Sequence, residues 1–227
     1  MTALWLSRAR LRRDTTAVAS LARLLVPDGD GPRAAAAHRL VWALFADAPE
    51  RQRDFLWREE APGRFMALSA RPPAPVPDLF DVDVTPFEPA LARGDRLGFT
   101  LRANPVVSRA VMPGQRGRRH DVVMDALRHV AKHERAARRL AVATETGLAW
   151  LTRQGSAHGF APDRVGVDGY ETMRLPRDAG REHVRFSQME FTGTLSVTDP
   201  ALFLAALAVG FGRARAFGCG LMLIRRA

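Results

Sequence analysis

Cysteine is almost absent from this sequence, since Cys219 is the single example among 227 residues. One cysteine excludes an intrachain disulfide and a thiolate metal cluster, and it fits a reducing compartment. Long apolar runs are also lacking: the longest, residues 201–211, is shorter than the roughly 20 residues that span a bilayer. Arginines occupy the N-terminal stretch where a secretory signal would carry apolar residues. The sequence therefore predicts a cytoplasmic protein with no membrane partner.

Lysine and tyrosine are equally scarce, with Lys132 and Tyr170 the single examples. Lysine and arginine together number 34 against 24 acidic residues, so the formal charge of +10 is carried almost wholly by arginine. Guanidinium groups match phosphate through paired hydrogen bonds and stack on bases. This balance favours a polyanionic partner, although an arginine-rich genome would produce part of the same bias. Charge alone does not choose between RNA, DNA and an anionic membrane.

The first part of the chain predicts the order β-α-β-β-β, with a stiff proline-rich connector before its last strand. Alternating or apolar patterns predict strands at 3–11, 55–59, 65–70 and 79–84, and helical patterns cover 14–25 and 33–45. Asp28 or Asp30 is the expected N-cap of the second helix, with Pro32 near its first position. Pro62 and Gly63 favour a hairpin turn between the two middle strands. Pro86, Pro89 and Gly94 mark the expected boundary between two halves.

The second part predicts the same order with both helices present. Strands are expected at 96–103, 164–174, 184–197 and 221–224, with a bulge near Ser187, where the apolar parity shifts. Helices are expected at 121–140, 147–153 and 201–209, the last with Asp199 as N-cap and Gly210 at its C-terminal end. Residues 109–119 look like a flexible basic hairpin or loop. The order β-α-β-β-α-β is the ferredoxin-like motif. We therefore predict an α+β fold of two tandem ferredoxin-like (RRM-like) domains, residues 1–88 and 95–227, whose sheets leave a cleft and a basic face.

Residues 210–220, GFGRARAFGCG, form a glycine-rich loop between the last helix and the last strand. Its glycines follow the pattern G-x-G-x5-G-x-G and enclose Arg213 and Arg215; the glycines are Gly210, Gly212, Gly218 and Gly220. Backbone N–H groups in such a loop suit an anion. The signal is weak by itself, because helix ends and tight turns also collect glycine. A dinucleotide site is excluded, since that motif follows a strand and opens a helix.

Four motifs in order give the loop a context. Residues 191–226, ending in the glycine-rich loop and terminal strand, resemble the C-terminal signature of repeat-associated RNA-binding proteins of CRISPR systems. AHRLVWALF at 37–45, RDFLWR at 53–58 and LRANPVVSR at 101–109 match further motifs upstream. Together they resemble the CasE family, the repeat endoribonucleases of type I-E CRISPR systems. The resemblance implies the same tandem ferredoxin-like fold.

Metal-independent RNA cleavage needs a base for the ribose 2′-OH, an acid for the leaving 5′ oxygen and cations for the developing charge. Histidine suits the proton transfers near pH 7. Of six histidines, His38 stands where the family has its catalytic histidine, although its helical spacing from Val41, Trp42 and Phe45 also fits a packing role. Many family members carry a tyrosine where this chain has Ala35. Arg33, Arg39 and Arg213 are candidates to hold the phosphate there, but arginine is a poor proton donor, so the second catalytic role stays unassigned.

Binding of the RNA is assigned to basic residues spread over the second half. Arg109, Arg116, Arg118 and Arg119 suit phosphates or a stem-loop groove, Arg102 extends that face, and the glycine-rich loop would hold the backbone near the cut. A solvated charged surface is the alternative for the basic stretch. His129 and His133 have the spacing of a zinc pair, but nothing completes a site, so no metal or cofactor is expected.

The resemblance implies an endoribonuclease that binds the stem-loop of CRISPR repeat precursor RNA and cuts at its 3′ base. Expected products are a 2′,3′-cyclic phosphate and a 5′-OH, with the enzyme retained as a subunit of the type I-E surveillance complex. A noncatalytic RNA-binding subunit of the same superfamily is the alternative that Ala35 keeps open. A general nucleic-acid or ribosome-associated module would explain the charge but not the ordered motifs.

Overall fold

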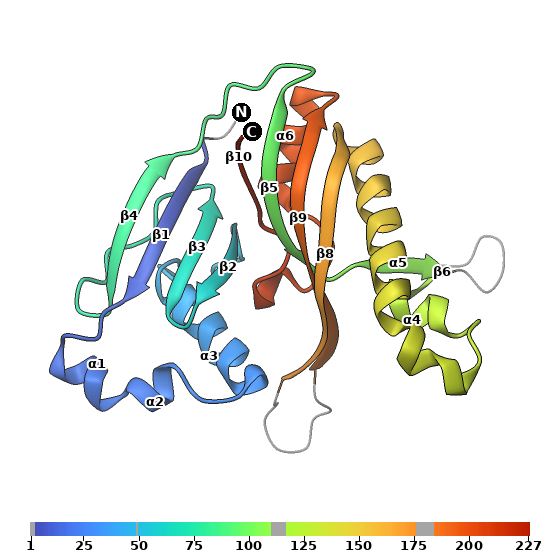
Figure 1. Cartoon of the computed structure of the whole chain (residues 1–227). Helices are drawn as coiled ribbons and strands as arrows, with labels where there is room; N and C mark the ends of the chain where they lie inside the picture. Colours follow the sequence, from blue (N-terminus) through green and yellow to red (C-terminus); the bar gives the residue numbers. More distant parts are fainter. Residues whose placement is uncertain (1–2, 49, 110–116, 176–183) are drawn as a thin grey trace.

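The computed structural model describes residues 3–48, 50–109, 117–175 and 184–227, and it contains two four-stranded antiparallel sheets (Figure 1). The strand order is β2-β3-β1-β4 in the first sheet and β10-β5-β9-β8 in the second. Both are the order of a ferredoxin-like β-α-β-β-α-β unit, in which the first strand lies between the third and fourth. The fold is therefore α+β with two tandem ferredoxin-like units, as the sequence predicted. The domain boundaries at 88 and 95 stay a prediction.

The first unit runs from β1 to β4. Its elements are β1 (Trp5–Leu11), α1 (Thr16–Ser20), α2 (Ala22–Leu25), α3 (Asp30–Ala43), β2 (Phe55–Ala61), β3 (Arg64–Ser69) and β4 (Phe80–Pro86). The helix predicted at 14–25 is two short helices that meet at Leu21. The N-cap of α3 is Gly29, with no side-chain cap, so the assignment of that cap to Asp28 or Asp30 was wrong. Between β3 and β4 the described chain has no helix, in agreement with the stiff connector.

The second unit inserts a hairpin after its first strand. Its elements are β5 (Arg96–Ala103), β6 (Val106–Arg109), β7 (Arg118–Asp121), α4 (Val122–Leu127), the 3₁₀ turn η1 (Lys132–Glu134), α5 (Arg135–His158), β8 (Phe160–Leu175), β9 (Val184–Val197), α6 (Pro200–Val209), the 3₁₀ turn η2 (Arg215–Phe217) and β10 (Met222–Arg226). β6 and β7 pair as the two arms of a basic hairpin, and residues 110–116 between them lie outside the described residues. The Asp199 side chain accepts a hydrogen bond from Leu202 N at 3.0 Å, and Gly210 ends α6, as predicted.

Two helical predictions in the second unit were wrong. The helix expected at 121–140 is broken after α4, and the short helix expected at 147–153 is the middle of α5, which runs for 24 residues. Gly155 looks like a helix breaker in the sequence. In the structure a Cβ there would lie 2.4 Å from the carbonyl oxygen of Phe160, so the glycine lets the helix approach the start of β8 closely.

The bulge expected near Ser187 was also wrong. β9 pairs with β5 in a continuous register. The two register shifts in the β8–β9 pairing each place an extra residue on β8, one between Pro162 and Val165 and one between Asp168 and Glu171. Ser187 is buried on the core side of β9, whereas Phe186 faces the other side and stacks on Phe217, 5.5 Å away between ring centroids. An aromatic residue on the outer face, rather than a bulge, explains the parity shift.

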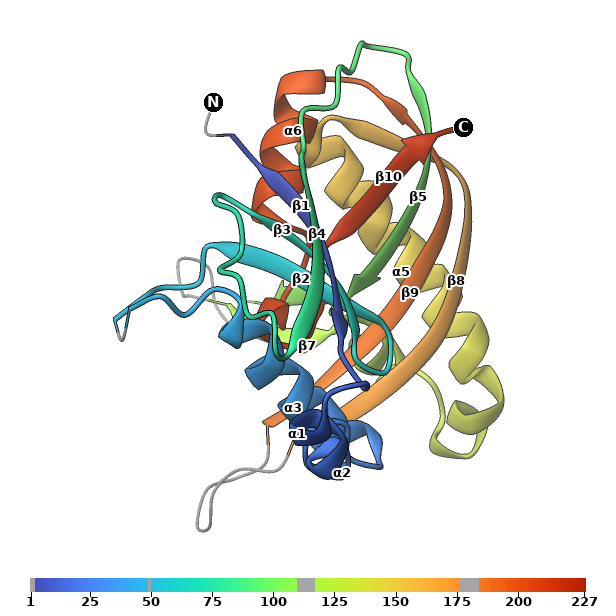
Figure 2. The same ribbon diagram turned by 90° about the vertical axis from the view of Figure 1, so that its left-hand side faces the viewer.

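Each sheet has one face covered by helices and one face turned toward the other sheet. Figure 2, in which the first sheet faces the viewer, shows α5 and α6 behind β10 and β5. Strand alternation divides the apolar side chains accordingly: Phe55 and Trp57 of β2 pack in the core under α3, while Leu56 packs with Met66, Leu68 and Leu221 between the sheets. This leaves the ends of β8 and β9 beside α3 (Figure 1), where the candidate site lies. No described helix is long and apolar enough to cross a membrane.

Candidate active site and RNA-binding surface

His38 lies on α3 and reaches across to the glycine-rich loop. Its Nδ1 is 2.7 Å from the carbonyl oxygen of Ala216, which also accepts a hydrogen bond from Trp57 Nε1 at 3.2 Å. Because a carbonyl oxygen only accepts, Nδ1 must carry a proton in this contact. The nitrogen that gains and loses a proton is therefore Nε2, and in the neutral ring its lone pair is available to a substrate.

The surroundings of His38 favour the neutral ring. The side chain is half-buried, with the Phe217 ring at 5.4 Å and the Trp42 ring at 6.3 Å between centroids. Burial lowers the pKa of His38 below its usual 6.5, and the charges of Arg53 and Arg39 lower it further, while the hydrogen bond to Ala216 opposes them. A base with a free lone pair at neutral pH is what removal of a 2′ proton requires.

The glycine-rich loop is mostly packed against the first sheet. Gly210, Gly218 and Gly220 are buried, and a Cβ on Gly218 would touch the Trp57 ring at 3.4 Å. Gly212 is partly exposed and Arg213 exposed, and a bridge between Asn104 and Arg213 fastens the loop to the end of β5. Close packing of Gly210, Gly218 and Gly220 thus brings Ala216 to His38, and Gly218 also belongs to the wall of the adjacent cleft.

A cleft of about 300 Å³ opens between the two sheets beside this contact. Phe217, which lies against the His38 ring, belongs to its wall, as do Trp57 and Gly218. Asp30 and Arg33 of α3 and Glu59 of β2 line one side, and Glu171 and Gln188 of β8 and β9 line the other. The cleft holds charges of both signs, so it is no simple cationic channel.

The predicted arginines fall into two groups. Three are paired: Arg33 with Asp30 at 3.0 Å, Arg102 with Glu190 at 2.5 Å, and Arg109 with Asp125 at 2.9 Å. The pair of Arg102, together with its hydrogen bond to Glu59 O at 3.3 Å, joins the two sheets. These contacts give the three residues structural roles beside the predicted one.

The second group has no acidic partner within the described part of the chain. It comprises Arg39, Arg118, Arg119, Arg213 and Arg215. Arg215 donates to the carbonyl oxygen of Gly212 at 3.2 Å, and the other four are exposed. Arg116 lies outside the described residues. Unpaired arginines are the ones free to bind phosphate without first breaking an ion pair.

Sequence reasoning missed Arg53. The RDFLWR motif was used only as a match, yet the charge of Arg53 contributes to the lowered pKa of His38. Its Nη1 is buried without a hydrogen-bond partner in the described structure. The sequence carried no signal for this, because an arginine two positions from Arg51 and five from Arg58 looks like either of them.

The family tyrosine has no evident replacement. Ala35 lies on α3, one turn before His38. The hydroxyl of Tyr170 donates to Asp121 Oδ1 at 2.9 Å, and Asp121 also caps α4 by accepting from Met124 N. Burial and the nearby Asp121 carboxylate raise the pKa of Tyr170. Tyr170 is therefore engaged at the start of α4 rather than presented as a proton donor.

The alternative metal pair is not supported by the local geometry. His129 lies in the turn after α4 and His133 in η1, so they do not share a helical face as the spacing suggested. Across residues 3–48, 50–109, 117–175 and 184–227, no group of three or more His, Cys, Asp or Glu side chains is arranged to hold a metal ion.

The two ferredoxin-like units meet along their open sheet faces. A histidine lies at the junction, with unpaired arginines around it. This arrangement defines a protein of the tandem ferredoxin-like class. Comparison with known proteins is more specific. Residues 4–226 match the model of the CRISPR associated protein family, and the chain belongs to that family.

Individual relatives agree with this placement. The chain is 32% identical over 150 residues to the CRISPR-associated endoribonuclease Cse3 of Thermus thermophilus; the match covers 61% of this chain and 60%, less than two thirds, of the relative's length. A structure of CRISPR endoribonuclease Cse3 bound to 19 nt RNA superposes with a TM-score of 0.69 at 25% identity, covering 99% of both chains. The crystal structure of Cas6e from Escherichia coli K-12 has the same fold, with a TM-score of 0.63 at 19% identity over 98% of this chain and 100% of that one.

Proposed function

We propose that this protein is an endoribonuclease that binds the stem-loop of CRISPR repeat RNA and cuts it without a metal ion. Membership of the family, and likeness over the whole chain to an endoribonuclease with RNA bound, support the substrate class. The observation that carries the proposal is the contact of His38 Nδ1 with the Ala216 carbonyl oxygen, which leaves Nε2 as the free base.

In the proposed reaction His38 Nε2 takes the proton of the ribose 2′-OH. The 2′ oxygen forms a bond to the adjacent phosphorus while the bond from phosphorus to the 5′ oxygen breaks. The products are a 2′,3′-cyclic phosphate and a 5′-OH, and the 5′ oxygen gains its proton from an acid that we leave unassigned. The charges of Arg53 and Arg39, which lower the pKa of His38, favour the neutral base and suit the extra negative charge of the phosphorane.

The remaining predicted contacts spread the RNA over both units. The exposed, unpaired Arg118 and Arg119 on the β6–β7 hairpin suit the phosphates of the stem, and Arg213 and Arg215 suit the strand that enters the site. Retention of the cleaved hairpin would make the protein a subunit of a type I-E surveillance complex and its kinetics single-turnover. A structure named CRISPR RNA-guided surveillance complex contains a chain with this fold, at 19% identity and a TM-score of 0.60.

A noncatalytic RNA-binding subunit is the second candidate, favoured by Ala35 at the position of the family tyrosine. One experiment separates the two. A labelled repeat hairpin is incubated with excess protein in EDTA, and wild type is compared with His38→Ala. Cleavage at one site with a cyclic phosphate end, lost in the variant while binding persists, is the expected result. Binding without cleavage by wild type would favour the noncatalytic subunit, and unchanged cleavage by His38→Ala would move the active site elsewhere.

A further inference from the structure

Arg53 carries a charge that nothing in the described structure neutralises. It lies in the segment between α3 and β2, two residues before β2 begins, and its side chain is half-buried. Its Nη1 atom is buried and has no hydrogen-bond partner. A buried donor without a partner is costly, and a buried charge without a counter-ion more so. A folded chain retains such a group most readily where a ligand supplies the hydrogen-bond acceptor and the opposite charge.

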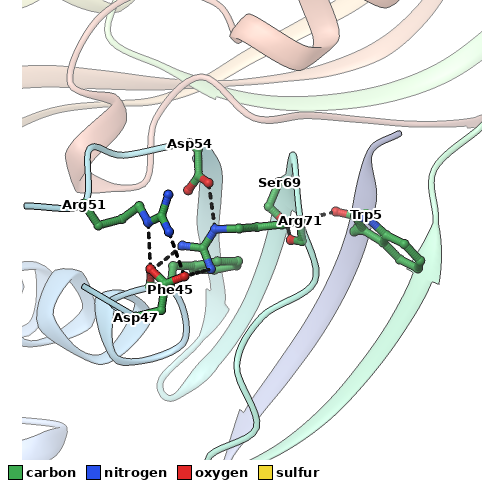
Figure 3. A network of polar contacts seen from close by, with 7 residues as sticks. All are labelled: Trp5, Phe45, Asp47, Arg51, Asp54, Ser69 and Arg71. Atoms are coloured by element: carbon green, nitrogen blue, oxygen red, sulfur yellow. Dashed lines mark hydrogen bonds and ion pairs between the residues drawn. The ribbon is translucent and has the colours of Figure 1, made fainter. Parts of the chain in front are cut away.

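Acidic residues lie near Arg53 in the chain, but their carboxylates pair with other arginines. Arg51, two residues earlier, pairs with Asp47 at 2.6 Å. Asp54, the next residue, accepts from Arg71 Nε at 2.8 Å. Figure 3 shows these side chains converging on Asp47 and Asp54. Arg53 thus takes no part in the network that pairs Arg51 and Arg71 with acids.

The contacts of Arg71 also hold Arg53 in place relative to His38. Arg71 donates to Asp54 at the start of β2 and to the carbonyl oxygen of Phe45 at the end of α3, and it pairs with Asp47 at 3.3 Å (Figure 3). Because α3 carries His38, these contacts fix the backbone next to Arg53 to the helix that bears the candidate base. A group held in this way is preorganised for a ligand.

Arg215 and His38 belong to the same junction as Arg53. Ala216, the residue after Arg215, contacts His38 of α3 and Trp57 of β2, the strand that begins two residues after Arg53. The charge of Arg215 lowers the pKa of Arg53, after burial as the first cause, and the charge of Arg53 lowers the pKa of His38. Among the described residues, Arg215 is bonded to a carbonyl oxygen, that of Gly212, and to no acid. Two guanidinium groups without an acidic partner among the described residues and a neutral imidazole therefore belong to one junction, and this combination suits a phosphate.

We infer that Arg53, together with Arg215, binds the scissile phosphate of the RNA and stabilises the charge that develops on it during cleavage. The inference rests on the proposed function and adds to it a residue that contacts the reacting group. The planar guanidinium fork donates two hydrogen bonds to the nonbridging oxygens and keeps its own proton throughout. His38 Nε2 remains the group that removes the 2′ proton.

The first test compares Arg53→Met, Arg53→Lys and Arg51→Met in single-turnover cleavage of a repeat hairpin at saturating protein. Arg51→Met removes the same group from the same segment and is the matched control. We expect Arg53→Met to cleave about 100-fold more slowly than wild type, as for loss of one preorganised donor to a transition state. Arg53→Lys should recover part of the rate, because it keeps the charge but not the fork. Cleavage by Arg53→Met at the wild-type rate would overturn the inference.

The second test separates contact with the phosphate from a structural role. Two hairpins carry a 2′-deoxy nucleotide that blocks cleavage, one with the natural phosphate and one with an uncharged methylphosphonate at the scissile position. Wild type and Arg51→Met should bind the methylphosphonate hairpin at least about tenfold more weakly than the hairpin with the natural phosphate. For Arg53→Met the affinities for the two hairpins should agree within about twofold. A tenfold preference that persists in Arg53→Met would assign the residue to structure alone.

The same comparison distinguishes failure of this inference from failure of the proposed function. If wild type binds but never cleaves, loss of the phosphate preference in Arg53→Met still establishes the contact, and only the catalytic proposal fails. If wild type cleaves but Arg53→Met keeps the preference for the natural phosphate over the methylphosphonate, only the inference fails. Failure of wild type to bind a repeat hairpin more tightly than unrelated RNA at matched salt would overturn both.

Discussion

The pH dependence of cleavage gives the sharpest test of His38 as the base. The rate should follow the fraction of protein with an unprotonated Nε2, because a protonated ring cannot accept the 2′ proton. Burial and the charges of Arg53 and Arg39 lower the pKa of His38 below 6.5. The rate should therefore rise with pH, reach half its maximum at a pH below 6.5, and be constant through pH 7 and 8.

The size of the fall at low pH follows from the same shift. A base with the usual histidine pKa would lose about 30-fold in rate between its plateau and pH 5. Since the pKa of His38 is lower, we expect a loss smaller than about 30-fold. Arg39→Gln removes one exposed charge that disfavours protonation of His38. The cleavage rate of this variant should therefore fall between the plateau and pH 5 by about 1.5 to 5 times as much as that of wild type.

The assay is single-turnover cleavage of a labelled repeat hairpin between pH 5 and 8, with binding measured at each pH so that the protein stays saturating. His38→Ala gives the baseline at every pH. A rate that increases toward low pH would identify His38 as the acid instead of the base. A half-maximum at or above pH 6.5 would contradict the environment deduced for the ring.

Three further predictions concern stability, reactivity and binding. Gly210→Ala should lower the free energy of unfolding by about 2–5 kcal/mol in urea titrations, because φ is +81° and the new Cβ would lie 2.7 Å from Leu56 Cδ1. Cys219 should react with a thiol reagent at pH 8 more than about 100-fold more slowly in the native than in the unfolded protein, because burial raises its pKa to about 12. Replacing both Arg118 and Arg119 with Gln should weaken hairpin binding and reduce the slope of log affinity against log salt by about 1.5 to 2.

Each of these has a control. Gly94 also has a positive φ, +92°, but open space around a new Cβ, so Gly94→Ala should cost only the conformational part, about 1–2 kcal/mol. If Gly94→Ala and Gly210→Ala lost equal free energy of unfolding, the contact of the new Cβ with Leu56 would not explain the loss at Gly210. Rapid labelling of native Cys219 would mean that its site opens readily. A salt slope unchanged by the two Gln substitutions would place the phosphates elsewhere, and the cleavage rate at saturating protein should not change in either case.

Local patterns were sufficient for most of the fold. Strand alternation at 96–103 gave β5 to the residue, Pro62 and Gly63 placed the β2–β3 turn, and the caps Asp199 and Gly210 bounded α6. These features depend on neighbours in the chain, which the sequence displays. The errors arose where a local signal had a distant cause. Gly155 is required by close approach to Phe160, and Phe186 faces outward to meet Phe217 on another element.

For the site, the sequence by itself determined which groups are present and on which elements: a histidine on α3, an arginine-bearing glycine-rich loop before β10, and a basic hairpin after β5. Their chemical roles stay predictions. Only the tertiary structure decided their partners, because Ala216 lies 178 residues from His38 and Glu190 lies 88 from Arg102. An ion pair or hydrogen bond depends on which group the fold brings within about 3 Å. The sequence therefore shows 34 basic residues alike, whereas packing pairs Arg51, Arg71 and Arg102 with acids and leaves Arg53 Nη1 without a partner among the described residues.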